Sequence, residues 1–574
     1  MCNNHHHSRH TVSRRNFLKF AGATVGASVV EVIASVVPVT HSPLIPALAQ
    51  GDFADTILVN GNLITMGPPD RVATAIAIKN GFILQVGLDT EIRALAGDAT
   101  QIIDLQGQTV TPGLIDAHNH LMSYGTLLSN FVPMVPPEVR TLDQLLTKVQ
   151  EAVAAKPVGD WVQGYFWPPD AMPTRHELDP ISPDNPVWLM QQGGHFGVAN
   201  SLALDIADIT AETPDPDGGV IDRDENGKPT GVLYNHRAMD LLRAHAPMAT
   251  SEELFRSLHF AEEMMIAAGV TTYHDCNARF RNMEAYALAF EQQAAMLRGE
   301  VFYTVEWPRD VLTALEEFTY FSDDFMRFAG FKFLLDGQYP TWYTSEPHPG
   351  IRWDMPTWDP DMFKEAILRL HNTGLQISVH CGGDAAFDLT LDAFEAAMNA
   401  NPRPDPRHRI EHAMLTWPES IDRAASLGVH ISTQPQFLRF LHNPEIFGEE
   451  RAARLVATRD WLNAGINVAL GSDAPSTPWH APNVTLIGAL LRPDGNMNPH
   501  HPEQAMTIQE ALHAHTMGSA RAAFEENVKG SLEPGKFADL VVWNDDFYAI
   551  SDPMDIAEIR PQLTMINGEI VHQT

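Results

Sequence analysis

Apolar runs of strand length alternate with amphipathic helical patterns through the middle of this 574-residue chain. In segments such as residues 360–374 and 418–428, apolar positions recur every three or four residues, which is typical of helices with one buried face. The strand-like runs are residues 109–118, 269–275, 300–307, 331–337, 375–384, 408–413, 428–436 and 466–473. Eight strands alternating with helices predict an α/β fold, a closed parallel (β/α)8 TIM barrel over residues 111–528.

Both ends of the chain carry shorter strand-like runs separated by tight turns. Residues 53–110 contain Asn-Gly pairs at 60–61 and 80–81, which favour two-residue hairpin turns. The same pattern returns in residues 529–574, with an Asn-Gly pair at 567–568. We therefore expect a small β-sandwich domain built from both chain ends.

The alternation breaks between residues 122 and 249, where proline, glycine and tryptophan are frequent. An insertion of this length after the first barrel strand is more than a loop, and we interpret it as a lid over the barrel mouth. Its aromatic side chains either contact an apolar part of a substrate or form the core of the lid itself. These aromatic residues are Phe166, Trp167, Trp188 and Phe196.

The first 49 residues have the pattern of a twin-arginine export signal. Arg14 and Arg15 precede Phe17 and Leu18, an apolar stretch follows, and small residues lead up to Ala49. The alternative is an ordinary N-terminal anchor. The signal predicts recognition by the twin-arginine translocase during export and a periplasmic or extracellular location.

Charge and composition exclude several classes of partner. The formal net charge is −34, and such an acidic protein repels nucleic acid backbones and anionic lipid surfaces. The body of the chain has no apolar run of about 20 residues, so we expect no stable membrane association. Three cysteines are too few for a disulfide framework. Besides the translocase, we expect a small-molecule substrate as partner and no nucleic acid.

The first strand-like run ends in a pair of histidines, His118 and His120. Residues two apart on an extended strand point to the same side, so both imidazoles face the barrel mouth and can share one divalent cation. An isolated pair of this kind is weak evidence, because single histidines are more often surface or core residues.

Lys332 stands between Phe331 and Phe333 in an apolar strand. Burying a lone ammonium is costly, so this lysine should be neutralised, paired or chemically modified. Carboxylation by carbon dioxide would turn it into an anionic oxygen ligand able to bridge two cations. The alternative is a lysine whose stem reaches solvent.

Three further polar residues follow apolar strand runs: His380, His412 and Asp473. Nitrogen and carboxylate ligands in this mixture suit zinc or a similar first-row ion. Any one of them could be a hydrogen-bonded core residue. Their recurrence at successive strand ends, where (β/α)8 barrels carry out chemistry, favours a metal site.

Several motifs together resemble the amidohydrolase superfamily, in particular its amidohydrolase 3 (YtcJ-like) branch. They are TPGLIDAHNH (111–120), FKFLLDG (331–337), VHCGGDAA (379–386), RIEHA (409–413), GSDAPS (471–476) and GSLEPGKFADLVVW (530–543). The resemblance implies one or two metal ions, with zinc expected. It implies that His118, His120 and Asp473 hold one ion, that His380 and His412 hold a second, and that carboxylated Lys332 bridges them.

The chain departs from the usual family pattern in the pocket and the lid. It has Gly-Gly-His at residues 193–195, Phe-Trp-Pro at residues 166–168 and alanine at position 474. These departures leave the metal ligands intact and put the substrate in doubt. Members of the family are often dimers or larger, so a homo-oligomer remains open.

The function that follows is hydrolysis of a nonpeptide C–N bond in a small, partly apolar amide by metal-bound hydroxide. Asp473 would act as base and then as acid, and His195 would contact the oxyanion or the substrate or, alternatively, cap a loop. Asp384 would orient a metal ligand or cap the following helix. The alternatives are an esterase or lactonase of the same fold, a mononuclear hydrolase with unmodified Lys332, and an exported non-catalytic binding protein.

Overall fold

The computed structural model describes residues 53–67, 73–166, 172–191, 193–316, 321–347, 355–441, 444–477 and 479–574. The expected export signal, residues 1–49, lies outside the described residues. No helix in the described part of the chain is long and apolar enough to cross a membrane.

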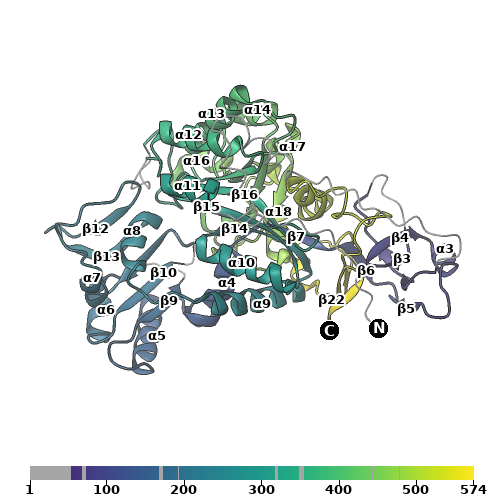
Figure 1. The fold of residues 1–574 in the computed structure, drawn as a ribbon, viewed down its shortest axis with the longest axis horizontal. Coiled ribbons are helices and arrows are strands. Elements are labelled where there is room, and N and C mark those ends of the chain that lie inside the picture. Colours follow the sequence, from purple (N-terminus) through teal and green to yellow (C-terminus); the bar gives the residue numbers. More distant parts are fainter. Residues whose placement is uncertain are drawn as a thin grey trace, which may run out of the picture.

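The barrel predicted from the sequence is confirmed. Eight parallel strands pair in the order β20-β19-β18-β17-β16-β15-β14-β7 at the centre of the molecule (Figure 1). They are β7 (Leu114–Asn119), β14 (Val270–Ala278), β15 (Arg298–Val305), β16 (Met326–Leu334), β17 (Gln376–Cys381), β18 (Arg409–His412), β19 (His430–Thr433) and β20 (Val468–Leu470). Helices on the outside include α9 (Ser251–Ala267), α10 (Phe280–Gln292), α11 (Pro308–Glu316), α12 (Pro360–His371), α13 (Asp384–Ala400), α14 (Pro418–Ser426) and α18 (Pro482–Leu491).

The first and last strands meet through backbone contacts next to the predicted site. The N–H of Asp473 donates to the carbonyl of His118 at 2.8 Å, and the N–H of His120 donates to the carbonyl of Ala474 at 2.9 Å. A Cβ at Gly471 would lie 2.5 Å from the backbone nitrogen of His118. Only glycine therefore permits this close approach of the two segments.

Strand alternation explains how a lysine enters the barrel interior. Phe331 and Phe333 are fully buried, and Phe333 packs edge-on against Phe363 of α12 with ring centroids 5.6 Å apart. Lys332 points to the opposite side of β16, into the barrel. In register it lies beside Ser378 of β17, which in turn lies beside Arg409 of β18. The barrel interior therefore contains a polar layer surrounded by apolar side chains.

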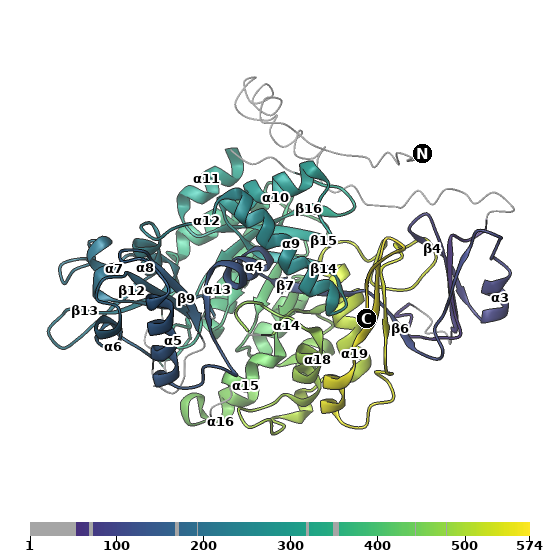
Figure 2. The same cartoon turned by 90° about the horizontal axis from the view of Figure 1, so that it is seen from below.

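Both ends of the chain build a β-sandwich at one side of the barrel (Figure 2). One sheet has the order β4-β3-β1-β5 and the other β2-β6-β21-β22-β23. The strands are β1 (Thr56–Val59), β2 (Asn62–Leu63), β3 (Ala75–Lys79), β4 (Phe82–Gly87), β5 (Gln101–Asp104), β6 (Thr109–Pro112), β21 (Leu540–Trp543), β22 (Pro561–Ile566) and β23 (Glu569–Gln573). Strand β6 pairs antiparallel with β21, and the shared core includes Leu58, Ile76, Val110 and Leu540.

The insertion after β7 forms a six-stranded sheet of order β12-β13-β11-β10-β9-β8, on the other side of the barrel from the β-sandwich (Figure 1). Its elements are β8 (Val132–Met134), α5 (Leu142–Ala154), β9 (Val162–Phe166), α6 (Arg175–Leu178), β10 (Val187–Gln191), β11 (Phe196–Ala199), α7 (Ser201–Ile206), β12 (Val220–Arg223), β13 (Pro229–Tyr234) and α8 (Asn235–Arg243). Trp188 and Phe196 are buried in its own core clusters and do not line the main cavity, so for these two aromatics the structure favours the interpretation as lid core. The side chain of Phe166 and all of Trp167 lie outside the described residues.

A buried ion pair joins the barrel to the β-sandwich. Arg298 at the start of β15 donates from Nε and Nη2 to the carboxylate of Asp539 at 2.6 and 3.0 Å, and both side chains are almost fully buried. The guanidinium also lies over the ring of Phe537, 3.7 Å from its centroid. Two parallel charge-assisted bonds fix the relative orientation of the two units.

We predict that Asp539→Asn lowers the free energy of unfolding by about 3–5 kcal/mol, because it leaves the Arg298 charge buried without a counter-ion. Urea unfolding followed by circular dichroism measures the change. Glu365→Gln removes an exposed ion pair to Arg369 on α12 and serves as the control, with an expected effect below about 0.5 kcal/mol. Equal effects of the two substitutions would contradict the role assigned to the buried pair.

Candidate metal centre

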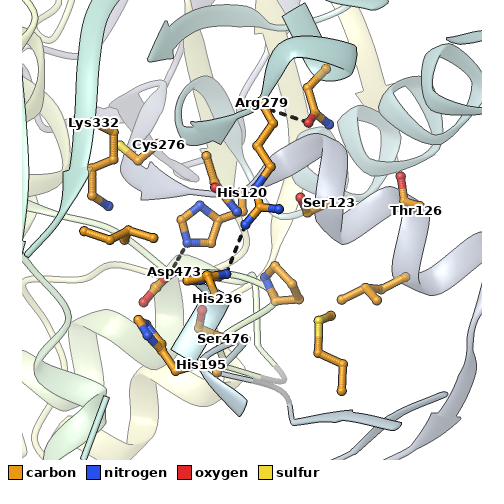
Figure 3. A pocket seen from close by; sticks show the side chains of 18 of the residues that line it. His120, Ser123, Thr126, His195, His236, Cys276, Arg279, Lys332, Asp473 and Ser476 are labelled. Carbon is orange, nitrogen blue, oxygen red and sulfur yellow. Dashed lines mark hydrogen bonds and ion pairs between the residues drawn. The ribbon is translucent and has the colours of Figure 1, made fainter. Parts of the chain in front are cut away.

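Five of the six predicted ligands line a cavity at the carboxyl ends of the barrel strands, and the sixth, His118, lies behind them. The cavity has a volume of about 250 Å³. The barrel contributes His120, Lys332, His380, His412 and Asp473 to its wall, and the insertion contributes His195. Figure 3 shows His120, His195, Lys332 and Asp473 around a common space. Residues spread over more than half of the chain therefore meet at one end of the barrel.

His118, His120 and Asp473 form a compact group. Oδ1 of Asp473 lies 3.0 Å from Nε2 of His120 and 3.6 Å from Nε2 of His118. One ligand atom from each of the three residues lies within 4.8 Å of the others. Nε2 of His118, Nδ1 of His120 and Oδ1 of Asp473 are buried and have no hydrogen-bond partner among the described residues. Buried polar atoms without partners are rare, and this donor set fits a divalent cation.

A buried carboxylate fixes the orientation of His118. Oε2 of Glu411 lies 2.5 Å from Nδ1 of His118, while Arg409 and Ser378 donate to Oε1 at 2.8 and 2.7 Å. Burial alone would raise the pKa of Glu411, but the charges of Arg409 and Lys332 outweigh it and hold the pKa below its usual value. Ionised Glu411 therefore keeps the proton on Nδ1 and leaves the Nε2 lone pair for a metal.

His380 and His412 form the second predicted pair, with ring centroids 4.4 Å apart. Nε2 of His380 lies 3.2 Å from the carbonyl of Gly337, and Nδ1 of His412 lies 2.6 Å from Oε1 of Gln434. Since these oxygens only accept, each ring places its proton there and keeps the other nitrogen as a lone pair. Burial lowers the pKa of both imidazoles well below the usual value, so they are neutral, as metal ligands must be.

Two of these residues adopt a backbone conformation that is rare for residues other than glycine. His412 has φ = 70° and Asp473 has φ = 53°. The left-handed turn at His412 breaks strand alternation, so the consecutive residues Glu411 and His412 both reach the site. Strain of this kind is characteristic of functional sites.

Lys332 is 1% exposed, so its stem does not reach solvent. Among the described residues no carboxylate forms an ion pair with its ammonium group. It lines the cavity together with His380 and Asp473. Its charge contributes, after burial, to lowering the pKa of His118. An unpaired buried ammonium is costly, which agrees with the expectation that this lysine is neutralised or modified.

Cys276 of β14 is a residue that the sequence analysis missed. Its thiol, His118 and Glu411 form a second group of close ligand atoms. Burial raises the pKa of the thiol, and Glu411 is already bonded to Arg409, so this group fits a cation less well than the first.

His195 lies where the insertion meets the barrel mouth. Its ring centroid is 4.9 Å from that of His380 and 5.3 Å from that of His236 on α8. Burial, with the charge of Lys332, lowers the pKa of His195 to about 3, so its ring is neutral. His236 was not identified from the sequence because nothing in a helical pattern shows which face meets the barrel.

Asp384 contacts none of the predicted metal ligands among the described residues, and Asp336 takes the position beside His380. Asp384 accepts hydrogen bonds from Ser345, Trp417 and the N–H of Ala385 in the first turn of α13, whose N-cap is Gly383. Asp336 instead lies 3.5 Å from Nε2 of His380 and accepts from the N–H groups of residues 343, 382 and 383. Burial raises the pKa of Asp336 to about 7.

Comparison with known proteins identifies the class. The model of the amidohydrolase family matches residues 101–572. The chain is 31% identical over 516 residues to Protein LONG AFTER FAR-RED 3 of Arabidopsis thaliana, covering 86% of this chain and 87% of that protein. It is 30% identical over 549 residues to N-substituted formamide deformylase of Arthrobacter pascens, covering 90% and 98%.

A solved structure described as an uncharacterized metal-dependent hydrolase from Pyrococcus furiosus is similar with a TM-score of 0.67 and 26% identity, over 86% of this chain and 99% of that one. The fold, the site and these similarities define a metal-dependent hydrolase that acts on carbon–nitrogen bonds other than peptide bonds. This chain belongs to the amidohydrolase family.

We predict that Glu411→Gln weakens metal binding by about 10- to 100-fold, because the amide no longer holds His118 in one tautomer. Elemental analysis after equilibration with a chelator of known affinity measures the change. Ser378→Ala, which removes only a neutral donor from Glu411, should have a smaller effect. Unchanged metal affinity in a folded Glu411→Gln protein would contradict the orienting role.

Proposed function

We propose that this chain hydrolyses the formamide or other small acylamide bond of a partly apolar amine, with zinc as its metal. The observation that carries the proposal is the convergence of buried ligand atoms from His118, His120 and Asp473, within 4.8 Å of one another, beside the unpaired Lys332. The similarity to N-substituted formamide deformylase over almost its whole length supports an amide substrate over an ester.

Two groups of ligands, which face Lys332 from different parts of the barrel mouth, would each hold one cation. His118, His120 and Asp473 would hold one ion, and His380 and His412 would hold the other through the nitrogens that their hydrogen bonds leave free. When bound, divalent cations supply Lewis acidity that polarises the substrate carbonyl and lowers the pKa of water. The neutral amine of Lys332 would add to carbon dioxide and release one proton, which gives a carbamate with two oxygen ligands.

Asp473 and His195 would act on the reacting atoms. Asp473 takes the proton that water loses during attack on the carbonyl carbon and passes it to the leaving nitrogen. His195 is neutral at physiological pH, so its N–H can donate to the carbonyl oxygen as negative charge develops there. The tetrahedral carbon then breaks its bond to nitrogen and releases a carboxylic acid and an amine.

An apolar part of the substrate has two places to bind. The main cavity includes Leu127, Phe131 and Leu254, and an adjoining cavity beside His380 and His412 has apolar walls. The apolar residues of the adjoining cavity are Trp342, Met414, Phe437, Phe440 and Leu441. They follow barrel strands and do not belong to the lid. These loops would select the apolar group, whereas Trp188 and Phe196 belong to the core of the insertion itself.

The proposal is tested with purified, zinc-loaded protein on a panel of N-formyl and N-acetyl amines, matched esters and lactones. We expect release of amine from the amides, loss of this activity after exhaustive chelation, and recovery when zinc is added. Asp473→Asn should lower kcat by at least about 1,000-fold, because it removes both the proton acceptor and a ligand. Rapid cleavage of esters without cleavage of any amide would refute the amide assignment.

The bridging role of Lys332 generates a separate prediction. Lys332→Ala should lose one of two bound metal ions and most activity, and short carboxylic acids such as formate or acetate should restore part of both by occupying the vacated position. Metal content per chain, activity with and without added acid, and the intact mass of the native protein are the measurements. Full metal content and activity in Lys332→Ala would show that no carboxylated lysine is required.

A further inference from the structure

The lining of the main cavity is much less acidic than the protein as a whole. The chain has a net charge of −34, yet among the described residues that line the main cavity Asp473 is the only carboxylate. Arg243 and Arg279 bring two cationic groups to the same wall, which Lys332 also lines. Lys332 belongs to the metal centre, whereas the two arginines lie at the boundary between the insertion and the barrel.

Arg279 is already engaged by anionic partners. Its Nη2 lies 2.6 Å from Oε1 of Glu306, and its Nη1 lies 3.4 Å from Oδ1 of Asp240. Nη2 also donates to Nδ1 of His236 at 3.1 Å, as the dashed line in Figure 3 marks. Its charge is therefore compensated, and its contacts hold His236 in place.

Arg243 has weaker partners. Its Nη1 lies 3.3 Å from Nδ1 of His236, and its Nη2 lies 3.2 Å from Sδ of Met190, a poor acceptor. Its nearest carboxylate among the described residues is Asp240, with 3.6 Å between Nη1 and Oδ1, and Arg279 shares that carboxylate. A guanidinium paired with a carboxylate normally forms two bonds of about 2.7–2.9 Å. Arg243 therefore lacks the partner that its geometry can bind.

Electrostatics supports the same conclusion. Burial and the nearby charge of Arg279 lower the pKa of Arg243 to about 10, and Asp240 and Glu306 only partly oppose this. A lowered arginine pKa means that the surroundings do not fully compensate the positive charge. An anion that entered the cavity would supply the missing interaction.

Arg243 lines the same cavity as the predicted metal ligands, and a chain of side-chain contacts joins it to them. Ring contacts lead from His380 to His195 at 4.9 Å and from His195 to His236 at 5.3 Å, and His236 contacts Arg243. Leu127, Met190 and Leu254 line the same cavity. A substrate that spans the cavity would thus meet the metal centre at one end, apolar side chains along its length and a guanidinium at the other end.

We propose that Arg243 binds a carboxylate of the substrate, so that the enzyme acts on acylamides of amines that carry a carboxylate separated from the amide by an apolar spacer. This inference rests on the proposed amide hydrolysis and adds the substrate class. Arg243 is a specificity-determining residue, and it takes no part in the bond-breaking step.

The test uses zinc-loaded enzyme and N-formyl ω-amino acids with spacers of increasing length, each compared with its neutral ω-carboxamide of nearly equal shape. We expect an optimum spacer length, at which the carboxylate substrate exceeds its neutral partner in kcat/KM. Arg243→Gln should lower kcat/KM for that substrate by about 10- to 100-fold, mainly through KM, and lower kcat/KM for the neutral partner much less. Arg243→Lys keeps the charge without the two-pronged geometry and should lose less.

Two further measurements separate the possible failures. Arg309→Gln removes an exposed arginine outside the cavity and is the matched control. Competitive inhibition by the free ω-amino acid, with equal unfolding midpoints of all variants, excludes a merely structural effect. If the enzyme cleaves no amide at all, the proposed function fails. If kcat/KM is equal for the neutral and the carboxylate-bearing amides, or if Arg243→Gln lowers both equally, amide hydrolysis stands and the carboxylate inference fails.

Discussion

A single buried charge, the carboxylate of Glu411, holds the centre of this site together. It contacts side chains from three elements: Arg409 on its own strand, Ser378 on β17 and His118 on β7. All of these side chains are inaccessible to water, so each lost contact would leave a polar group unsatisfied. The carboxylate therefore fixes the positions of the strands and the tautomer of a predicted metal ligand at once. The same interaction that fills the barrel interior thus makes the candidate metal centre rigid.

The cavity combines two sources of side chains with different tasks. Strand ends of the barrel provide the predicted metal ligands, and their positions are tied to backbone pairing. The insertion provides His195, His236 and Arg243, whose positions depend on how its own sheet and helix α8 rest against the barrel. Changes in the insertion can therefore alter what the cavity accepts without disturbing the metal centre, as is usual where a stable scaffold carries variable segments.

Strand periodicity explains which residues could be found from the sequence. Apolar runs of the right length predicted the eight barrel strands, and a polar residue at the end of a run marked His118, His380 and Asp473. Glu411 was not predicted, because strand alternation would place it on the opposite side of β18 from His412. The left-handed backbone at His412 breaks this alternation. Asp384 was predicted to orient a ligand because it follows two glycines after His380. The carboxylate that lies beside His380 is instead that of Asp336, which follows the preceding strand β16. Long-range contacts of this kind have no local signature.

The pairing of β6 with β21 joins residues that more than 400 positions separate along the chain. During synthesis, β6 can pair with β21 only after almost the whole chain has left the ribosome. Contacts so distant in sequence form slowly, since the entropy of closing a long loop must be overcome before any pairing energy is gained. The contact between Asp473 and His118 also joins distant parts of the chain, so the active site can assemble only after all eight barrel strands have been synthesised.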